Sequence, residues 1–309
     1  MRPYGQPARS ALTSTSADAP IVVLDSGLGG LTVVRALRET LPHEQILYFG
    51  DTARLPYGSK TTPTVTTFVR EIIAYLLPHG PKHVVVACNT ATALALPNLR
   101  ATFPDLSISG VIDPGSRVAV QAAGSKDSPV IGVIATEATI RSKAYERAIH
   151  RRRHHARMLL RPTALLVPII EEGRKPEDPL VGMALHQYLS PLFDRGIDVL
   201  VLGCTHYPIL KDAIQAMAGD RVRVIDSAQK CAEDVARRLT SAGLLRSAQG
   251  AGANEESSVG GGVKCFVTDN SPRFAVLAKR FLGLDVPPPT LVPLDELHRC
   301  AAELEPTWS

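Results

Sequence analysis

Short apolar runs alternate along the chain with longer stretches in which apolar positions recur every three or four residues. The short runs are typical of buried strands, and they lie at 21–24, 46–49, 83–87, 130–135 and 199–202. The longer stretches predict helices at about 31–41, 63–77, 179–192 and 228–242, and from about 139 onward. Strands that alternate with helices are typical of an α/β fold with mainly parallel sheets.

Two such series follow one another. The first opens with a strand, the glycine-rich turn 25–30 and a helix, which is typical of a doubly wound domain, and the second series begins at residue 130. We therefore predict two pseudo-symmetric doubly wound domains. The polar, small residues of 1–20 predict a disordered tail before them.

Weaker signals complete the prediction. They indicate a strand end with a hinge-like turn at 109–115, a short strand at 159–160, a strand at 222–227, a flexible loop at 247–262 and a strand at 263–267. Asn89 or Thr90 is suited to cap the helix after the 83–87 strand, and 269–272 predicts the capped start of a helix through about Leu282. The pattern assigns no element to the carboxy-terminal part.

Composition narrows the class of protein. With 309 residues and 45% hydrophobic content, the chain can fill two cores. It has no apolar run of 18 residues, which predicts no membrane span. Its five cysteines are an odd number without a CxxC pair, which argues against a disulfide framework and predicts a reducing cytoplasm.

Charge gives little support for a nucleic-acid partner. The net charge of +4 is modest for this length. A basic cluster runs from Arg147 to Arg161, and we interpret it as a solvated helix end and turn rather than a surface for an anionic partner.

Two strands, one in each series, end in a cysteine followed by small polar residues, in the sequences Cys88-Asn89-Thr90 and Cys204-Thr205-His206. Each strand is interpreted as the last of its half. Ligands of open α/β sheets bind beyond the carboxyl ends of strands. If the halves are pseudo-symmetric and face each other, the two thiols lie on opposite walls of one cleft.

Two opposed thiols suit proton transfer at a carbon. A base on one face removes a proton while an acid on the other face returns one, and the sulfurs would then lie about 7 to 8 Å apart. Neighbouring groups must adjust thiol ionisation, and Asp25 and His206 are the candidates. Asp25 also argues against phosphate binding at the glycine-rich turn 25–30, where the helix start would otherwise favour an anion.

Other interpretations remain open at this point. Cys88, Cys204 and His206 could bind zinc, although the sequence offers no evident fourth ligand. Cys204 could be the nucleophile of an acyl transferase with His206 as base, but sequence neighbours on such a turn are expected to point apart. Either cysteine could also be a buried structural residue, as we interpret Cys231, Cys265 and Cys300. Three acidic residues are interpreted as turn or cap residues: Asp113, Asp226 and Asp269.

Five motifs in order resemble the glutamate racemases of the cofactor-independent aspartate/glutamate racemase superfamily. The motifs are Leu24-Asp25-Ser26-Gly27-Leu28-Gly29-Gly30, Tyr48-Phe49-Gly50-Asp51 with Pro56-Tyr57-Gly58, Cys88-Asn89-Thr90-Ala91, Ala135-Thr136 with Thr139, Ser142 and Tyr145, and Leu202-Gly203-Cys204-Thr205-His206-Tyr207-Pro208. The match as a whole runs from about residue 21 to 228. The last eighty residues add little to the resemblance.

The resemblance implies interconversion of L- and D-glutamate for peptidoglycan synthesis, without a cofactor or metal, in a cleft between two domains. It implies that 21–113 and 226–309 form the first domain and 114–225 the second. Cys88 would act on the D-isomer and Cys204 on the L-isomer, and Asp25 and His206 would assist. Substrate would be bound by Asp25, Ser26, Pro56, Tyr57, Gly58, Asn89, Thr90, Thr136, Thr139, Thr205 and His206. A homodimer in the cytoplasm is implied as well.

One segment departs from the family pattern. Where the family reads Cys-Pro before an aliphatic run, this chain has Thr163-Ala164, while Glu171 after the run is retained. The departure puts local packing in doubt more than catalysis. Two further functions stay open: another enzyme of the superfamily, such as an aspartate racemase or a decarboxylase, and an anion or nucleic-acid binder that uses the basic cluster.

Overall fold

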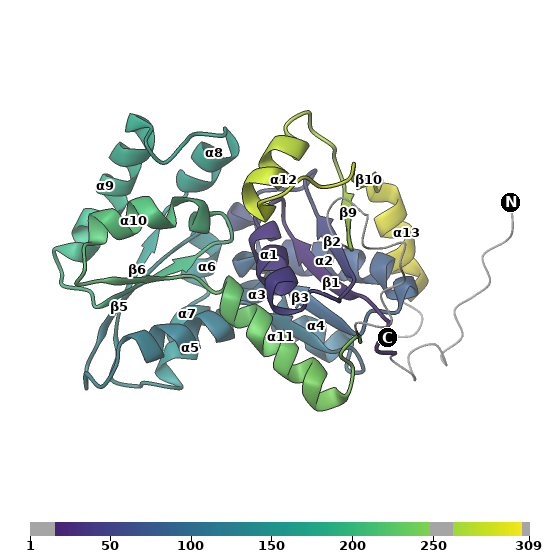
Figure 1. Cartoon of the computed structure of the whole chain (residues 1–309), viewed down its shortest axis with the longest axis horizontal. Coiled ribbons are helices and arrows are strands. Elements are labelled where there is room, and N and C mark those ends of the chain that lie inside the picture. Colours follow the sequence, from purple (N-terminus) through teal and green to yellow (C-terminus); the bar gives the residue numbers. More distant parts are fainter. Residues whose placement is uncertain (1–15, 248–261, 305–309) are drawn as a thin grey trace, which may run out of the picture.

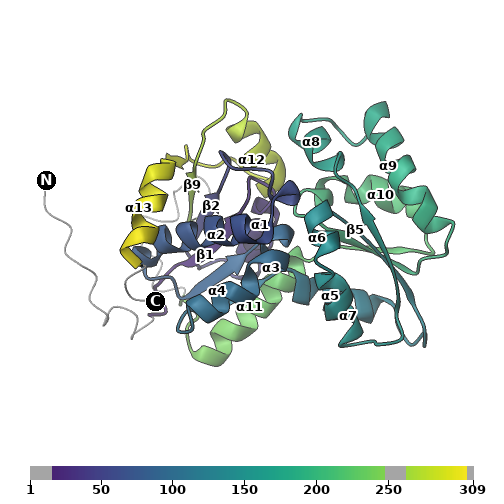
Figure 2. The same cartoon turned by 180° about the vertical axis from the view of Figure 1, so that it is seen from behind.

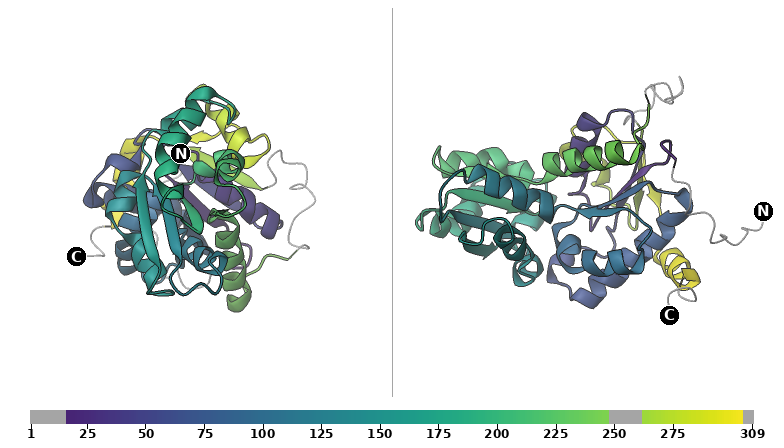
Figure 3. Two further views of the ribbon diagram at one scale, coloured as in Figure 1. Left: turned by 90° about the vertical axis from the view of Figure 1, so that its left-hand side faces the viewer. Right: turned by 90° about the horizontal axis from the view of Figure 1, so that it is seen from below.

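Two parallel sheets form the cores of two lobes that lie side by side (Figures 1 and 3). The structure, a computed structural model, describes residues 16–247 and 262–304. Within these ranges one sheet has the order β10-β9-β2-β1-β3-β4 and the other the order β6-β5-β7-β8. The first consists of β1 (Ile21–Asp25), β2 (Ile46–Gly50), β3 (His83–Val86), β4 (Ile108–Gly110), β9 (Val263–Val267) and β10 (Thr290–Leu291). The second consists of β5 (Val130–Ala135), β6 (Arg157–Pro162), β7 (Val199–Gly203) and β8 (Arg223–Ile225).

The two sheets repeat one arrangement, which confirms the predicted fold class. The order β2-β1-β3-β4 in the first lobe corresponds to β6-β5-β7-β8 in the second, and β9 and β10 extend the first sheet beyond β2. All these neighbours pair in parallel. The strands before the two cysteines, β3 and β7, are the third of each set, so the interpretation that each is the last strand of its half is wrong.

Helices cover both faces of each sheet. In the first lobe α1 (Leu31–Thr40), α11 (Ala228–Ala242) and α12 (Phe274–Leu282) lie on the face seen in Figure 1. The opposite face, seen in Figure 2, carries α2 (Thr62–Leu76), α3 (Asn89–Leu94), α4 (Leu96–Thr102) and α13 (Leu294–Leu304). In the second lobe α5 (Ile112–Ala122), α6 (Glu137–Arg141) and α7 (Ala144–His150) lie on one side, and α8 (Leu166–Glu171), α9 (Pro179–Phe193) and α10 (Lys211–Ala218) on the other.

Strands that are buried on both faces explain the continuous apolar runs of the sequence. In β1, Ile21 and Val23 pack under α1 while Val22 and Leu24 pack under α2. One apolar cluster extends from the α1 face of the first lobe into the α8 and α9 face of the second. The described part of the chain contains no helix that is long and apolar enough to cross a bilayer.

Several local predictions differ from the structure. Residues 112–115, expected in a hinge-like turn, are the first turn of α5, which therefore runs across the predicted domain boundary at 113/114. Helix α12 begins at Phe274 without a side-chain cap, so 269–272 does not cap it. Strand β6 is longer than expected, and the unassigned carboxy-terminal part contains α13.

The predicted tail is only partly described. Residues 16–20 form a turn whose Ala17 carbonyl accepts a hydrogen bond from Lys82 Nζ at 2.5 Å. Residues 1–15 and most of the predicted 247–262 loop lie outside the described residues.

A buried ion pair joins this turn to the first sheet. Lys82 Nζ lies 2.5 Å from Glu44 Oε2, and the two side chains are 0% and 2% exposed. Glu44 Oε1 also accepts a hydrogen bond from the Arg246 amide at 3.0 Å, and the Leu244 carbonyl accepts one from Lys82. Because the Lys82 ammonium group is removed from water, the free-energy cost of burying its charge has to be offset by the Glu44 carboxylate.

Glu44→Gln is therefore expected to lower the free energy of unfolding by about 3–5 kcal/mol, because it leaves the Lys82 charge buried without its counter-ion. Urea unfolding followed by circular dichroism measures the change. The matched control is Glu39→Gln, which removes an exposed partner of Arg35 and should cost less than about 0.5 kcal/mol. Equal losses for the two variants would contradict the expectation.

Candidate active site

The turns after β1 and β7 meet at the junction of the two lobes. A Cβ atom at Gly29 would lie 2.5 Å from Thr205 Oγ1 and 2.6 Å from His206 Nδ1, so only glycine permits this approach. Thr205 Oγ1 donates to Asp25 Oδ1 at 3.4 Å, and Thr32 Oγ1 donates to the Thr205 carbonyl at 3.4 Å. The structure thereby brings together predicted site residues that are far apart in the sequence.

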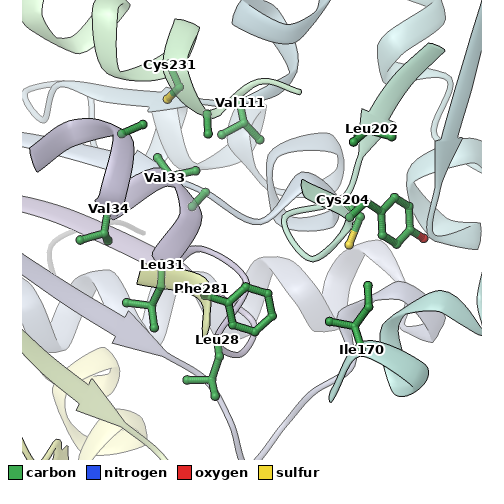
Figure 4. Packing of buried hydrophobic residues seen from close by; sticks show 14 of the residues in the cluster. Leu28, Leu31, Val33, Val34, Val111, Ile170, Leu202, Cys204, Cys231 and Phe281 are labelled. Carbon is green, nitrogen blue, oxygen red and sulfur yellow. The ribbon is translucent and has the colours of Figure 1, made fainter. Parts of the chain in front are cut away.

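Cys204 lies at the end of β7 and contacts His206. Its Sγ is 3.7 Å from His206 Nδ1, so the expectation that these side chains point apart is wrong. His206 Nε2 is 2.9 Å from Glu171 Oε1 at the end of α8. In Figure 4 the Cys204 side chain lies in an apolar region with Ile170 of α8 and Phe281 of α12 nearby.

The pKa of His206 departs from its ordinary value. Burial alone would lower this pKa, but the hydrogen bonds to Cys204 and Glu171 outweigh burial and raise it to about 10. The raised pKa favours the protonated imidazole, which can donate from both ring nitrogens, to the Cys204 sulfur and to the Glu171 carboxylate.

Cys88 lies in a different environment. Its Sγ accepts a hydrogen bond from the Ala91 amide at 3.4 Å, so Cys88 itself is the N-cap of α3 and the prediction of Asn89 or Thr90 is wrong. The thiol donates to Ser26 Oγ at 3.5 Å. Burial, with further contributions from the negative charges of Asp25 and Cys204, raises the pKa of Cys88 to about 12.

Asp25 lies beneath both turns. It is 1% exposed, and its Oδ2 accepts a hydrogen bond from the Gly27 amide at 3.0 Å. Burial raises the pKa of this carboxyl, although His206 and the hydrogen bonds oppose the shift. The predicted separation of about 7 to 8 Å between the sulfurs of Cys88 and Cys204 stays a prediction.

Three predicted binding hydroxyls form a triangle between the lobes. Thr90 Oγ1 is 2.8 Å from Thr136 Oγ1 and 3.2 Å from Thr139 Oγ1, and the last two are 3.0 Å apart. Asn89 Oδ1 accepts a hydrogen bond from Tyr145 OH at 2.7 Å. Asn89 is 3% exposed, and its Nδ2 has no hydrogen-bond partner among the described residues.

The loop from Asp51 to Lys60 carries the remaining predicted binding residues. Pro56 is exposed. Tyr57 is buried, and its hydroxyl donates a hydrogen bond to the Asp51 carboxylate. A Cβ at Gly58 would lie 2.7 Å from Thr136 Cβ, so this loop touches the second lobe.

Sequence reasoning missed the partners of several site residues. It identified Glu171 only as a retained position, whereas the Glu171 carboxylate contacts His206 Nε2. It also missed the hydrogen bond that Tyr145 OH donates to Asn89. Thr163, at the departure from the family pattern, is hydrogen-bonded to Tyr207 OH at 2.7 Å. These contacts join separate elements, and only the resemblance to a family singled out Glu171, Tyr145 and Thr163 beforehand.

Other candidates lie outside this site. Cys231 and Cys265 are buried in the apolar cluster, and Cys300 is half-buried on α13. In the basic cluster, Arg152 pairs with Asp113 at 2.8 Å and Arg153 donates to the Gly124 and Lys126 carbonyls. No three His, Cys, Asp or Glu side chains of the described ranges are grouped so that they could hold a metal ion.

Comparisons with known proteins agree on one family. The family description Asp/Glu/Hydantoin racemase matches residues 30–235. The chain is 40% identical to the glutamate racemase of Chlorobaculum tepidum over 277 residues, which are 90% of this chain and 97% of the relative. It is 43% identical to that of Geobacter metallireducens over 263 residues, which are 85% and 92% of the two chains.

Solved structures give the same answer. The glutamate racemase of Francisella tularensis in complex with D-glutamate superposes with a TM-score of 0.80 at 33% identity, over 90% of this chain and 99% of that one. The Thermus thermophilus glutamate racemase in complex with beta-chloro-D-alanine gives a TM-score of 0.76 at 40% identity, over 91% and 99%.

Glu171→Gln is expected to lower the pKa of His206, because it removes one of the two anionic partners that raise it. NMR titration of the imidazole measures the value. Since the folded-state pKa is raised, the stability from this group is complete below about pH 6.5 and is lost as pH rises towards 10. In Glu171→Gln, the free energy of unfolding should therefore fall less steeply than in the wild-type protein as pH rises from about 6.5 towards 10.

The control for this measurement is Glu172→Gln. Glu172 is the next residue, it is exposed, and it pairs with Arg174 rather than with His206. An unchanged His206 titration in Glu171→Gln would refute the assigned cause.

Proposed function

The chain belongs to the Asp/Glu/hydantoin racemase family, and within it to the glutamate racemases, and from this premise we propose that it interconverts L- and D-glutamate by two-cysteine proton transfer. It is thus an isomerase. The observation that carries the mechanism is the equivalent placement of Cys88 and Cys204 after β3 and β7, with a different partner beside each thiol.

The two environments suit opposite starting roles. Cys204, which contacts His206, is the base that removes the α-proton of L-glutamate. Cys88, whose pKa is raised to about 12, remains a thiol and donates a proton to the opposite face of the carbanion. The reverse reaction starts with a Cys88 thiolate and a Cys204 thiol, so Cys88 acts on the D-isomer.

The polar groups around the thiols suit the charged ends of glutamate. The unpartnered Asn89 Nδ2 supports a contact with a substrate carboxylate, since a buried amide donor needs an acceptor. The hydroxyls of Thr90, Thr136, Thr139 and Thr205 supply further donors. Asp25 is the anion that would receive the ammonium group or assist Cys88, and Ser26 with the loop of Pro56, Tyr57 and Gly58 completes the binding set.

The wider proposals follow from the family. We infer a domain of residues 21–113 with 226–309, a second of 114–225, and a substrate site in the cleft between them. We also infer D-glutamate supply for peptidoglycan synthesis in the cytoplasm, a homodimer, and catalysis without a cofactor.

Purified protein is expected to equilibrate L- and D-glutamate without an added cofactor. In deuterium oxide each turnover should place deuterium at the α-carbon, because the proton returned comes from a solvent-exchanged thiol. Chiral chromatography and mass spectrometry measure both. Turnover of aspartate or a malonate with none on glutamate would favour another enzyme of the superfamily.

Cys88→Ala and Cys204→Ala are each expected to lower kcat for racemisation by about 10²–10⁴-fold, since each removes an acid or base. The matched control is Cys231→Ala, which deletes an equally buried thiol of the apolar cluster and should leave kcat within about twofold. Retained racemisation in Cys88→Ala would rule out the two-base mechanism.

A further inference from the structure

The loop from Asp51 to Lys60 connects the catalytic turn of the first lobe with the second lobe. At its start the Asp51 amide donates to the Asp25 carbonyl at 3.1 Å. Near its end the Gly58 backbone lies directly against Thr136. The position of this loop therefore sets the space between the two lobes on the side of Asp25.

A fully buried carboxylate anchors the loop from beneath. Asp51 is 0% exposed, and it accepts hydrogen bonds from Tyr57 OH, from Arg54 Nε at 2.8 Å and from Thr268 Oγ1 at 2.9 Å. Because Tyr57 belongs to the proposed binding set, the Asp51 contact fixes one of its members directly. Burial raises the pKa of Asp51, and Arg54 opposes this shift.

Arg54 extends the anchor to helix α2. Its Nη1 pairs with Glu71 Oε2, and its guanidinium lies 4.1 Å from the centre of the Phe68 ring, also on α2. The side chains of Arg54 and Glu71 are 8% and 9% exposed. His298 Nε2 of α13 lies 3.7 Å from Glu71 Oε1. A planar guanidinium that binds two buried carboxylates is held in one orientation.

We propose that Glu71 is a positioning residue of the substrate site, which acts through Arg54 and Asp51 to hold the Pro56-Tyr57-Gly58 segment against Thr136. No described contact joins Glu71 to any of the proposed substrate-binding residues. This inference rests on the proposed function, because that function assigns the segment to substrate binding. Loss of the Glu71 charge frees Arg54 to rotate away from Asp51. The loop from Asp51 to Lys60 is then less ordered in the free protein, and substrate binding has to order it.

The primary experiment compares Glu71→Gln with Glu44→Gln. Both variants neutralise a buried carboxylate that pairs with a buried cation in the first lobe, but Glu44 pairs with Lys82, and none of its ion pairs or hydrogen bonds among the described residues reaches the loop. Glu71→Gln is expected to raise KM for glutamate about tenfold and to leave kcat within about twofold, because substrate binding has to order the loop while the thiols are unchanged. Glu44→Gln should leave both within about twofold. Equal changes in KM for the two variants would overturn the proposal.

A second variant protects the test against misfolding. Arg54→Lys keeps the charge but cannot contact both carboxylates with a planar fork, so it should raise KM in the same way as Glu71→Gln. Thermal unfolding of each variant identifies any that is not folded at the assay temperature. A folded Arg54→Lys with unchanged KM also counts against the proposal.

Hydrogen exchange separates this inference from the proposed function. Glu71→Gln is expected to speed amide exchange about tenfold across residues 51–60 relative to Glu44→Gln, whether or not the protein acts on glutamate. Wild-type protein without activity on glutamate would refute the proposed substrate, while unchanged exchange at 51–60 would refute the role of Glu71.

Discussion

The close approach of the turns after β1 and β7 is the constraint on which the site depends. Because Gly29 has no side chain, Thr205 and His206 reach the first lobe and exclude water from the space around Asp25. Buried charges interact more strongly than exposed ones, since little solvent screens them. Burial raises the pKa of Cys88 and Asp25, whereas at His206 burial lowers the pKa and the contacts with Cys204 and Glu171 outweigh it.

The two thiols occupy equivalent positions in equivalent sheets, yet their partners differ in charge. Cys204 has a cation, which Glu171 holds in place, whereas Cys88 has the anion Asp25 nearby. A symmetric scaffold therefore gives the two thiols different electrostatic environments. Under the proposed function, an ammonium group bound near Asp25 would weaken the repulsion that adds to the effect of burial on the Cys88 pKa.

The sequence predicted the parts of the site that depend on short-range pattern. Apolar runs ending in Cys88 and Cys204 identified the strands, and parallel pairing then placed both cysteines at equivalent edges. Contacts between separate elements were not predictable in this way. The Cys204 and His206 side chains converge because residues 204–206 turn sharply before the short helix that follows, and Glu171 arrives from α8. Cys88 was missed as a cap because thiols are weak acceptors, and helix α13 was missed because its pattern follows a proline-rich stretch.

The hydroxyl triangle of Thr90, Thr136 and Thr139 joins the two lobes through hydrogen bonds between neutral groups. Each hydroxyl has one proton to donate, and in the triangle these protons are satisfied by the other two oxygens. Under the proposed function, a substrate carboxylate bound here would take over these donors, so its binding would exchange hydrogen bonds rather than add them. The net gain would then come from the charge of the carboxylate, because hydrogen bonds to an ionised acceptor are roughly twice as strong as those between neutral groups.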